Sequence, residues 1–179
     1  MRTRVVLALI VIALLPACST LGGKAPPSER ATAVIQGTQP ESKISGTATL
    51  TPMRNGLKVL IRIANAPPGV HGIHFHQKGD CGDAGNAAGG HYNPDQVKHG
   101  FLPKDGFSGA HAGDLGNIMV GADGVGSLEL ILPGLTLREG PHSVDGRAII
   151  LHETRDDFGQ PTGNAGSRIG CGVITVSSD

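Results

Sequence analysis

Residues 43–77 read KISGTATLTPMRNGLKVLIRIANAPPGVHGIHFHQ, and this stretch decides the fold class. Apolar and polar residues alternate over 43–50 and again over 57–63, which is the period-two pattern of half-buried β-strands. Asn55-Gly56 between the two runs is a strong hairpin signal. A further strand is expected after the Pro-Pro-Gly break at 67–69. The stretch therefore predicts an antiparallel sheet.

The rest of the chain continues this all-β pattern. Strands are expected from about residue 33, over 115–120 and 125–132 as a pair around Ala122-Asp123-Gly124, and over 148–152 and 171–176. With 28 glycines in 179 residues and few aromatics, about eight short strands indicate one sandwich or barrel domain. The charge is balanced and no basic tract is present, so a nucleic-acid partner has no support.

The N-terminus has the pattern of an export signal. Arg2 and Arg4 precede an apolar run over 5–15 that is too short to span a bilayer. Leu15-Pro16-Ala17-Cys18 resembles the lipobox of bacterial lipoproteins, so we expect residues 1–17 to be a signal peptide that is removed and Cys18 to be lipidated. An ordinary secretory peptide with an incidental cysteine is the alternative.

Cys18 and the residues up to 32 would then form a lipidated, flexible tether, and residues 33–179 the folded domain. The expected place is the cell envelope, with a lipid anchor in the membrane. Ser19 follows the cysteine, where an aspartate would have indicated inner-membrane retention in a Gram-negative cell. In such a cell we therefore expect the periplasmic face of the outer membrane.

The two remaining cysteines agree with export. Cys81 and Cys171 are an even pair in an oxidising compartment, so a disulfide is the natural interpretation. It would close a loop of about 90 residues, for which the chain-entropy argument gives a stabilisation on the order of 4–5 kcal/mol. The alternative is that Cys81 is itself a metal ligand.

The histidines indicate metal chemistry. All eight lie between positions 71 and 152, and imidazole is the commonest ligand for copper and zinc. Six of them join one carboxylate in a candidate ligand set, which consists of His74, His76, His91, His99, His111, His152 and Asp114. Seven ligands exceed what one four-coordinate ion needs, so the count indicates two ions close together.

His74 and His76 are spaced i, i+2 on an expected strand. Their side chains therefore point to one face, where two imidazoles can reach one ion. A polar strand face is the alternative for such a pair taken alone. His152, at a strand end, is a third candidate for the same ion.

The long segment 78–114 has little periodicity and carries the other ligands. A loop of this length is uncommon in a compact domain unless it is functional or otherwise held. His99, His111 and Asp114 form a nitrogen and oxygen set suited to a closed zinc site. His91 lies between the two groups in sequence and fits either.

From about residue 33 to 177 the chain resembles the copper/zinc superoxide dismutase family. The matching segments are HGIHFH (71–76), GGHYNP (89–94), HAGDLGN (111–117), HSVDGRAIILHETRDD (142–157) and TGNAGSRIGCGVI (162–174). The resemblance implies an eight-stranded antiparallel Greek-key β-sandwich or barrel with long metal-binding loops. It also implies dismutation of superoxide to dioxygen and hydrogen peroxide, which would protect the cell envelope.

Carried over position by position, the resemblance assigns the ligands to two ions. It implies copper bound by His74, His76, His91 and His152, and zinc bound by His91, His99, His111 and Asp114. His91 would bridge the two ions as an imidazolate, which a neighbouring zinc ion makes easier to form. In the implied two-step reaction, His91 releases copper and carries a proton.

The resemblance also implies roles outside the ligand set. Asp156 matches an aspartate that accepts hydrogen bonds from one histidine of each ion, here His74 and His99; a solvated loop acid is the alternative. Arg168 matches the active-site arginine that holds the anionic substrate, and a structural role beside the disulfide is compatible with it. Thr162 matches the residue that narrows the channel opposite this arginine.

The other two histidines, His71 and His142, are expected to be structural and to bond to the backbone. The segment 153–167 is short beside the charged loop of familiar eukaryotic enzymes, and Arg155 is its one basic residue. A homodimer is left open.

Two other functions are alternatives. One is a metal-binding or copper-delivery module on the same fold without dismutase activity, which the complete ligand set and Arg168 disfavour. The other is a structural envelope lipoprotein with a zinc clip, for which the His74–His76 pair has no use. A zinc peptidase is excluded because His152-Glu153 lacks the second histidine of H-E-x-x-H.

Overall fold

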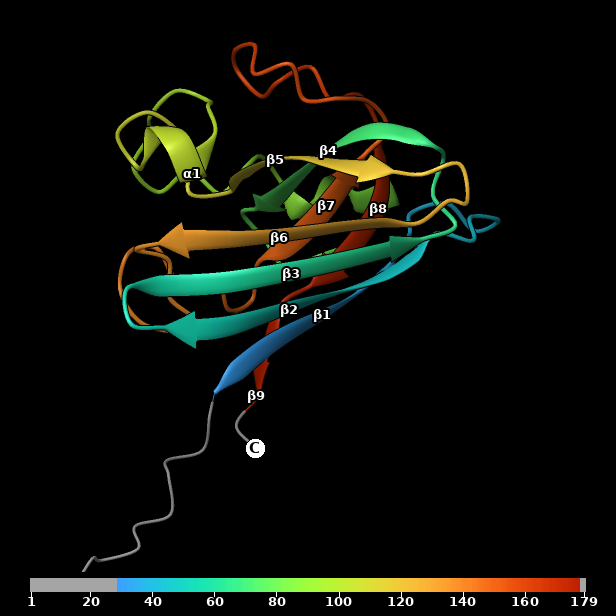
Figure 1. Ribbon diagram of the computed structural model, residues 1–179. Coiled ribbons are helices and arrows are strands. Elements are labelled where there is room, and N and C mark those ends of the chain that lie inside the picture. The colour runs from blue at the N-terminus through green and yellow to red at the C-terminus, as the bar shows by residue number, and fades with distance from the viewer. Residues whose placement is uncertain (1–28, 178–179) are drawn as a thin grey trace, which may run out of the picture.

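The structure is a computed structural model and describes residues 29–177 (Figure 1). Its strands are β1 (Arg30–Gly37), β2 (Ser45–Met53), β3 (Gly56–Ala64), β4 (Gly69–His76), β5 (Asp114–Val120), β6 (Gly126–Pro133), β7 (Ala148–His152), β8 (Arg168–Val173) and β9 (Thr175–Ser177). Two short helices, η1 (Asp83–Ala88) and α1 (Leu102–Asp105), lie between β4 and β5. Within these residues no helix is long and apolar enough to cross a membrane.

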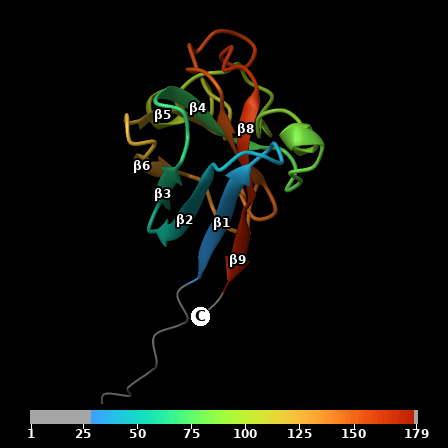
Figure 2. The same cartoon turned by 90° about the vertical axis from the view of Figure 1, so that its right-hand side faces the viewer.

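The strands close into an antiparallel barrel. Neighbours follow the order β2-β3-β6-β5-β4-β7-β8-β1-β9, and β1 also pairs with β2, which closes the ring. β8 and β9 are separated by Ile174 alone and both pair with β1, so they occupy one strand position (Figure 2). The barrel therefore has eight strand positions, as the sequence predicts.

The alternation read from the sequence sets the core. On β3, Leu57, Val59, Ile61 and Ile63 are all buried, while their neighbours face outward. The Asn55-Gly56 signal is confirmed, because β2 and β3 pair residue by residue up to the turn. Burial of each large aliphatic side chain contributes about 1.5–3 kcal/mol, so these positions hold the sheet in one register.

The pairing expected between 115–120 and 125–132 is largely wrong. β5 and β6 are joined by the predicted turn but pair only at Val120 and Gly126. β5 pairs mainly with β4, and β6 pairs along its length with β3. The short helix α1 contacts both strands, and its Leu102 is buried in the core.

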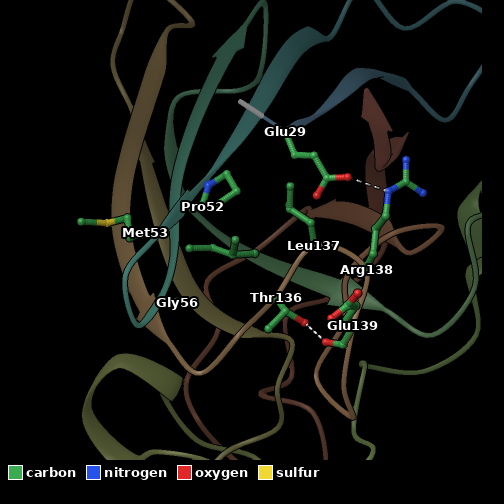
Figure 3. A pocket seen from close by; sticks show the side chains of 9 residues that line it. Glu29, Pro52, Met53, Gly56, Thr136, Leu137, Arg138 and Glu139 are labelled. Atoms are coloured by element: carbon green, nitrogen blue, oxygen red, sulfur yellow. Dashed lines mark hydrogen bonds and ion pairs between the residues drawn. The ribbon is translucent and has the colours of Figure 1, made fainter. Parts of the chain in front are cut away.

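The folded domain begins earlier than expected. The tether was expected to run to residue 32, but β1 starts at Arg30, and Ala31 is fully buried opposite Leu50. Just before it, Glu29 pairs with Arg138 at 3.3 Å beside a pocket of about 280 Å³ at this end of the barrel (Figure 3). The predicted signal peptide and Cys18 lie outside the described residues.

The long loops gather at the opposite end. Arg30 pairs with Ser177 at one end of the barrel, whereas α1 and the loop over 153–167 lie at the other (Figure 1). The segment between β4 and β5 is mostly irregular, as expected, although its two short helices were not predicted. These loops cover the outer face of β4 and β7, where the candidate ligands lie.

Candidate metal centre

β4 is buried on both faces, and this positions the first ligands. Ile73 and Phe75 point into the barrel core, while His74 and His76 point to the outer face and are also buried. The two imidazole rings are 6.4 Å apart between centroids. The i, i+2 spacing therefore places both rings on one face, as predicted, and the loop above removes them from solvent.

The loop over 77–113 is attached to β4 by main-chain hydrogen bonds. The amide of Tyr92 donates a hydrogen bond to the carbonyl of Phe75. The amide of Phe75 in turn donates to the carbonyl of Gly113. Gly113 lies so close to the Phe75 carbonyl that a Cβ atom has no room there. This close approach delivers His91 and Asp114 to the two histidines of β4.

The first cluster, here called the four-histidine group, consists of His74, His76, His91 and His152, all buried. One nitrogen of each ring lies within 4.8 Å of the others. The Nε2 atoms of His76 and His152 are 3.4 Å apart. Nδ1 of His76 donates to the Gly89 carbonyl at 2.9 Å, which turns its Nε2 towards the shared centre.

The second cluster, here called the Asp114 group, consists of His91, His99, His111 and Asp114, all buried. Nδ1 of His91 lies 2.9 Å from Asp114 Oδ1, and Nδ1 of His111 lies 3.1 Å from the same oxygen. Asp114 Oδ2 accepts hydrogen bonds from the amides of Gly100 and His111. His91 belongs to both clusters, so the structure brings all seven predicted ligands together.

Asp156 contacts one histidine of each cluster. Its Oδ2 is 2.8 Å from His74 Nε2, and its Oδ1 is 3.0 Å from His99 Nε2. These are the two histidines that the sequence analysis named. The carboxylate is fully buried, so the alternative of a solvated loop acid is wrong. Asp156 can fix the orientation of one ring in each cluster.

A pocket of about 200 Å³ opens onto the four-histidine group. Its lining includes His76, His91 and His152 together with Thr162 and Arg168. The Arg168 guanidinium donates to the carbonyls of Gly85 and Gly89, each at 2.6 Å. A small anion in this pocket would meet the arginine and the histidine nitrogens together.

The predicted disulfide joins this pocket to the barrel. Cys81 and Cys171 are bonded, with their Cα atoms 5.7 Å apart, so Cys81 is not a metal ligand. Cys171 belongs to β8, three residues after Arg168, and Cys81 precedes η1. The bond thus ties the carbonyls that hold the arginine to the strand that carries it.

Comparison with known proteins decides the family. The family model for copper/zinc superoxide dismutase (SODC) matches residues 44–174. This chain belongs to the copper/zinc superoxide dismutase family. Family membership gives the chain its activity, the dismutation of superoxide, and its two metals, copper and zinc.

Individual relatives agree. The chain is 37% identical to an extracellular Cu-Zn superoxide dismutase of Caenorhabditis elegans, over 97% of this chain and 78% of that protein. It is 39% identical to Cu-Zn superoxide dismutase 2 of Mesembryanthemum crystallinum, over 83% and 96%. The crystal structure of the clock protein EA4 superimposes with a TM-score of 0.73 at 38% identity, covering 86% of this chain and 97% of that one.

Two orphaned ring nitrogens show that the residues fit the family's metals. Among the described residues, Nδ1 of His74 and Nδ1 of His99 are buried without a hydrogen-bond partner. His99 Nδ1 lies 2.9 Å from Asp114 Oδ2 but is not aligned for a hydrogen bond to it. Two atoms that bind the same ion would have this arrangement. An unsatisfied buried polar atom costs about 1–3 kcal/mol, which a bound ion would remove in each cluster.

Burial keeps the four-histidine group neutral. It lowers the pKa of His76 to about 2, of His152 to about 3 and of His91 to about 4, and neighbouring histidines add to the effect for each ring. The pKa of His74 is lowered as well, again mainly by burial. A neutral imidazole is the form that binds a metal, so these rings need no deprotonation at neutral pH.

The Asp114 group is electrostatically different. Burial opposes the charge of Asp114, yet hydrogen bonds from His111 and His91, together with the nearby His99 ring, hold its pKa well below the ordinary range. Burial likewise disfavours the charged form of His99, but Asp114 and Asp156 raise its pKa to about 9. An ionised carboxylate beside imidazoles is a donor set that suits zinc.

The two histidines outside the clusters, His71 and His142, differ in their contacts. His71 is structural as expected, with Nδ1 2.9 Å from the His152 carbonyl and Nε2 2.8 Å from the Pro67 carbonyl. For His142 the expected backbone partner is wrong. Its Nε2 lies 2.7 Å from the Asp95 carboxylate and its ring stacks on Phe107 at 3.7 Å. These partners lie far from His142 in sequence, so only the fold could identify them.

Several residues that hold the site were not predicted from the sequence. The side-chain amide of Asn117 makes two hydrogen bonds to the main chain of Asp156, at 2.8 and 3.0 Å. Gln160 bonds in the same way to the main chain of His99. Asn117 ends the quoted HAGDLGN segment, so that motif was the available signal; no signal pointed to Gln160.

Proposed function

We propose that copper is bound by His74, His76, His91 and His152 and zinc by His91, His99, His111 and Asp114. The observation that carries this assignment is the sharing of His91 by two buried clusters of four ligand atoms each. Only imidazole among the side chains present offers two nitrogens to two cations at a fixed separation.

When bound, copper supplies one-electron redox chemistry and zinc a fixed positive charge beside His91. The protein's part is to bind and orient superoxide. Arg168 keeps its charge throughout and holds the anion against the pocket wall, while Thr162 limits the pocket to small molecules. One superoxide leaves as dioxygen and a second takes up two protons and leaves as hydrogen peroxide.

His91 is the proposed proton carrier. Its Nδ1 faces the zinc ligands, 2.9 Å from Asp114 Oδ1 and 3.5 Å from His111 Nδ1. The other ring nitrogen, Nε2, therefore faces the proposed copper site. The His91 ring also lines the pocket. Nε2 is therefore the atom at which His91 can hold a proton and release it to the reduced substrate.

The test combines metal content with superoxide disappearance. Purified protein should hold one copper and one zinc per chain and remove superoxide. Replacement of His152 by alanine should remove copper and activity while zinc stays. A His152→Ala protein that kept full activity would refute the assignment. Protein that binds both metals without removing superoxide would instead support the metal-delivery alternative.

We further propose export and anchoring through Cys18, after removal of residues 1–17. The relative in Caenorhabditis elegans is named extracellular, which supports export. The lipobox-like sequence and the following Ser19 favour a lipid anchor on the periplasmic face of an outer membrane. A Cys18→Ala protein should move from the membrane fraction to the soluble fraction. Recovery in the membrane fraction would refute the anchor.

The proposed function does not determine the oligomeric state. A homodimer is compatible with this proposal but nothing in the site depends on it, because all seven ligands and Arg168 come from one chain. Sedimentation equilibrium of the exported domain would distinguish monomer from dimer.

A further inference from the structure

The tip of the loop over 153–167 lies directly on the Asp156–His99 pair. Gly163 has a positive φ of 79°, and a Cβ atom at this position would collide with Asp156 Oδ1 and with His99 Nε2. The loop therefore covers the carboxylate and the ring without a side chain between them.

Gln160 fastens this tip to a proposed zinc ligand. Its Oε1 accepts a hydrogen bond from the His99 amide at 3.0 Å, and its Nε2 donates to the His99 carbonyl at 2.9 Å. The side-chain amide thus satisfies both polar groups of one residue, as a neighbouring strand would. Asn117 holds the main chain of Asp156 with the same pattern.

The ring of His99 is also covered from the same loop. Phe158 stacks on it with 6.2 Å between centroids and an interplanar angle of 21°. Phe158 remains 39% exposed, so the cover over His99 is a single layer thick. Gln160 and Phe158 thus add a hydrogen-bonded and a stacking contact to His99 beside the close approach of Gly163.

We propose that Gln160 is a positioning residue that retains zinc by fixing the main chain of His99 beneath this cover. The inference rests on the proposed zinc role of His99. Without the two hydrogen bonds, His99 can move with the loop over 93–100, and water or a chelator reaches the ion sooner. Gln160 does not line the pocket at Arg168, so it acts on metal release and not on the reaction.

The first measurement is the rate of zinc transfer to a coloured chelator from protein loaded with both metals at neutral pH. Loss of two hydrogen bonds in Gln160→Ala should speed release about tenfold. Gln39→Ala, a glutamine in the exposed turn after β1, should release zinc at the wild-type rate. Equal rates for Gln160→Ala and wild type would overturn the inference.

The second measurement separates positioning from general loosening. Hydrogen exchange of the His99 amide should become much faster in Gln160→Ala, with the barrel strands unchanged. Gln160→Glu keeps an acceptor for that amide and should retain part of its protection. Faster exchange spread over the whole barrel would contradict a positioning role. Wild-type protein that takes up no zinc would overturn the proposed function, and this inference with it.

Discussion

Arg168 and His76 donate hydrogen bonds to the same acceptor, the main-chain carbonyl of Gly89, at 2.6 and 2.9 Å. The group proposed to hold superoxide and a proposed copper ligand are thus fixed to one peptide. Gly89 follows η1, whose preceding residues are tied to β8 through Cys81. The position of the anion site therefore depends on the segment between the disulfide and His91.

Replacing Arg168 by alanine should lower the rate constant for superoxide by about tenfold or more while copper and zinc contents stay at the wild-type level. The reason is that the variant loses the positive charge at the pocket, whereas all seven ligands remain. Pulse-radiolysis rates and metal analysis on the same samples check this. Arg62→Ala, on the outer face of β3, is the matched control.

The variant Arg168→Lys separates the effect of the positive charge from that of the hydrogen-bonded position of the guanidinium. Lysine keeps the charge but cannot reproduce the two guanidinium hydrogen bonds to Gly85 and Gly89. We expect a rate between those of alanine and wild type. A lysine variant as slow as alanine would show that the hydrogen-bonded position matters more than the charge.

Reduction of the disulfide should reduce both stability and activity. The bond closes a loop with a sequence separation of 90, so its loss should cost on the order of 4 kcal/mol of unfolding free energy. Activity should fall as well, because the carbonyls that hold Arg168 lose their tie to β8. Urea unfolding and activity of Cys81→Ser/Cys171→Ser protein check both. Unchanged activity with lowered stability would limit the bond to a structural role.

Asp156→Asn should weaken metal retention about 10- to 100-fold, because the carboxylate orients one ring for each ion. The change keeps the side-chain size and removes the charge. Competition with a chelator measures the affinities. Asp157→Asn is the control, since Asp157 is exposed and bonds only within its own loop among the described residues. Equal losses in the two variants would contradict the role of Asp156.

Removal of both metals should lower the melting temperature by about 10 °C, because ions that bind only the folded state stabilise it by mass action. The two orphaned nitrogens, on His74 and His99, are the atoms left unsatisfied in metal-free protein. Calorimetry before and after dialysis against chelator, and after metal return, measures the effect. A melting temperature that did not respond to metal would refute the proposed ligand sets.

Much of the site was readable from the sequence because its signals are local. The His74–His76 spacing needs only a strand to place both rings together, and the alternation over 57–63 likewise predicts β3 and its buried face. The side-chain hydrogen bonds to the main chain of the site could not be predicted from the sequence. Gln160 and His99, for example, lie 61 residues apart. No local pattern distinguishes a glutamine that bonds a distant main chain from one in solvent.

By itself the sequence determined the all-β class, the candidate ligands and the two cysteines, because residue type and period are properties of neighbouring positions. Tertiary structure alone decided which strands pair and which loop covers which ligand. β5 and β6 are joined by the predicted turn, yet each strand pairs mainly with a different strand. Packing of distant segments outweighs a local turn, because burial of a whole strand face contributes more than one hairpin.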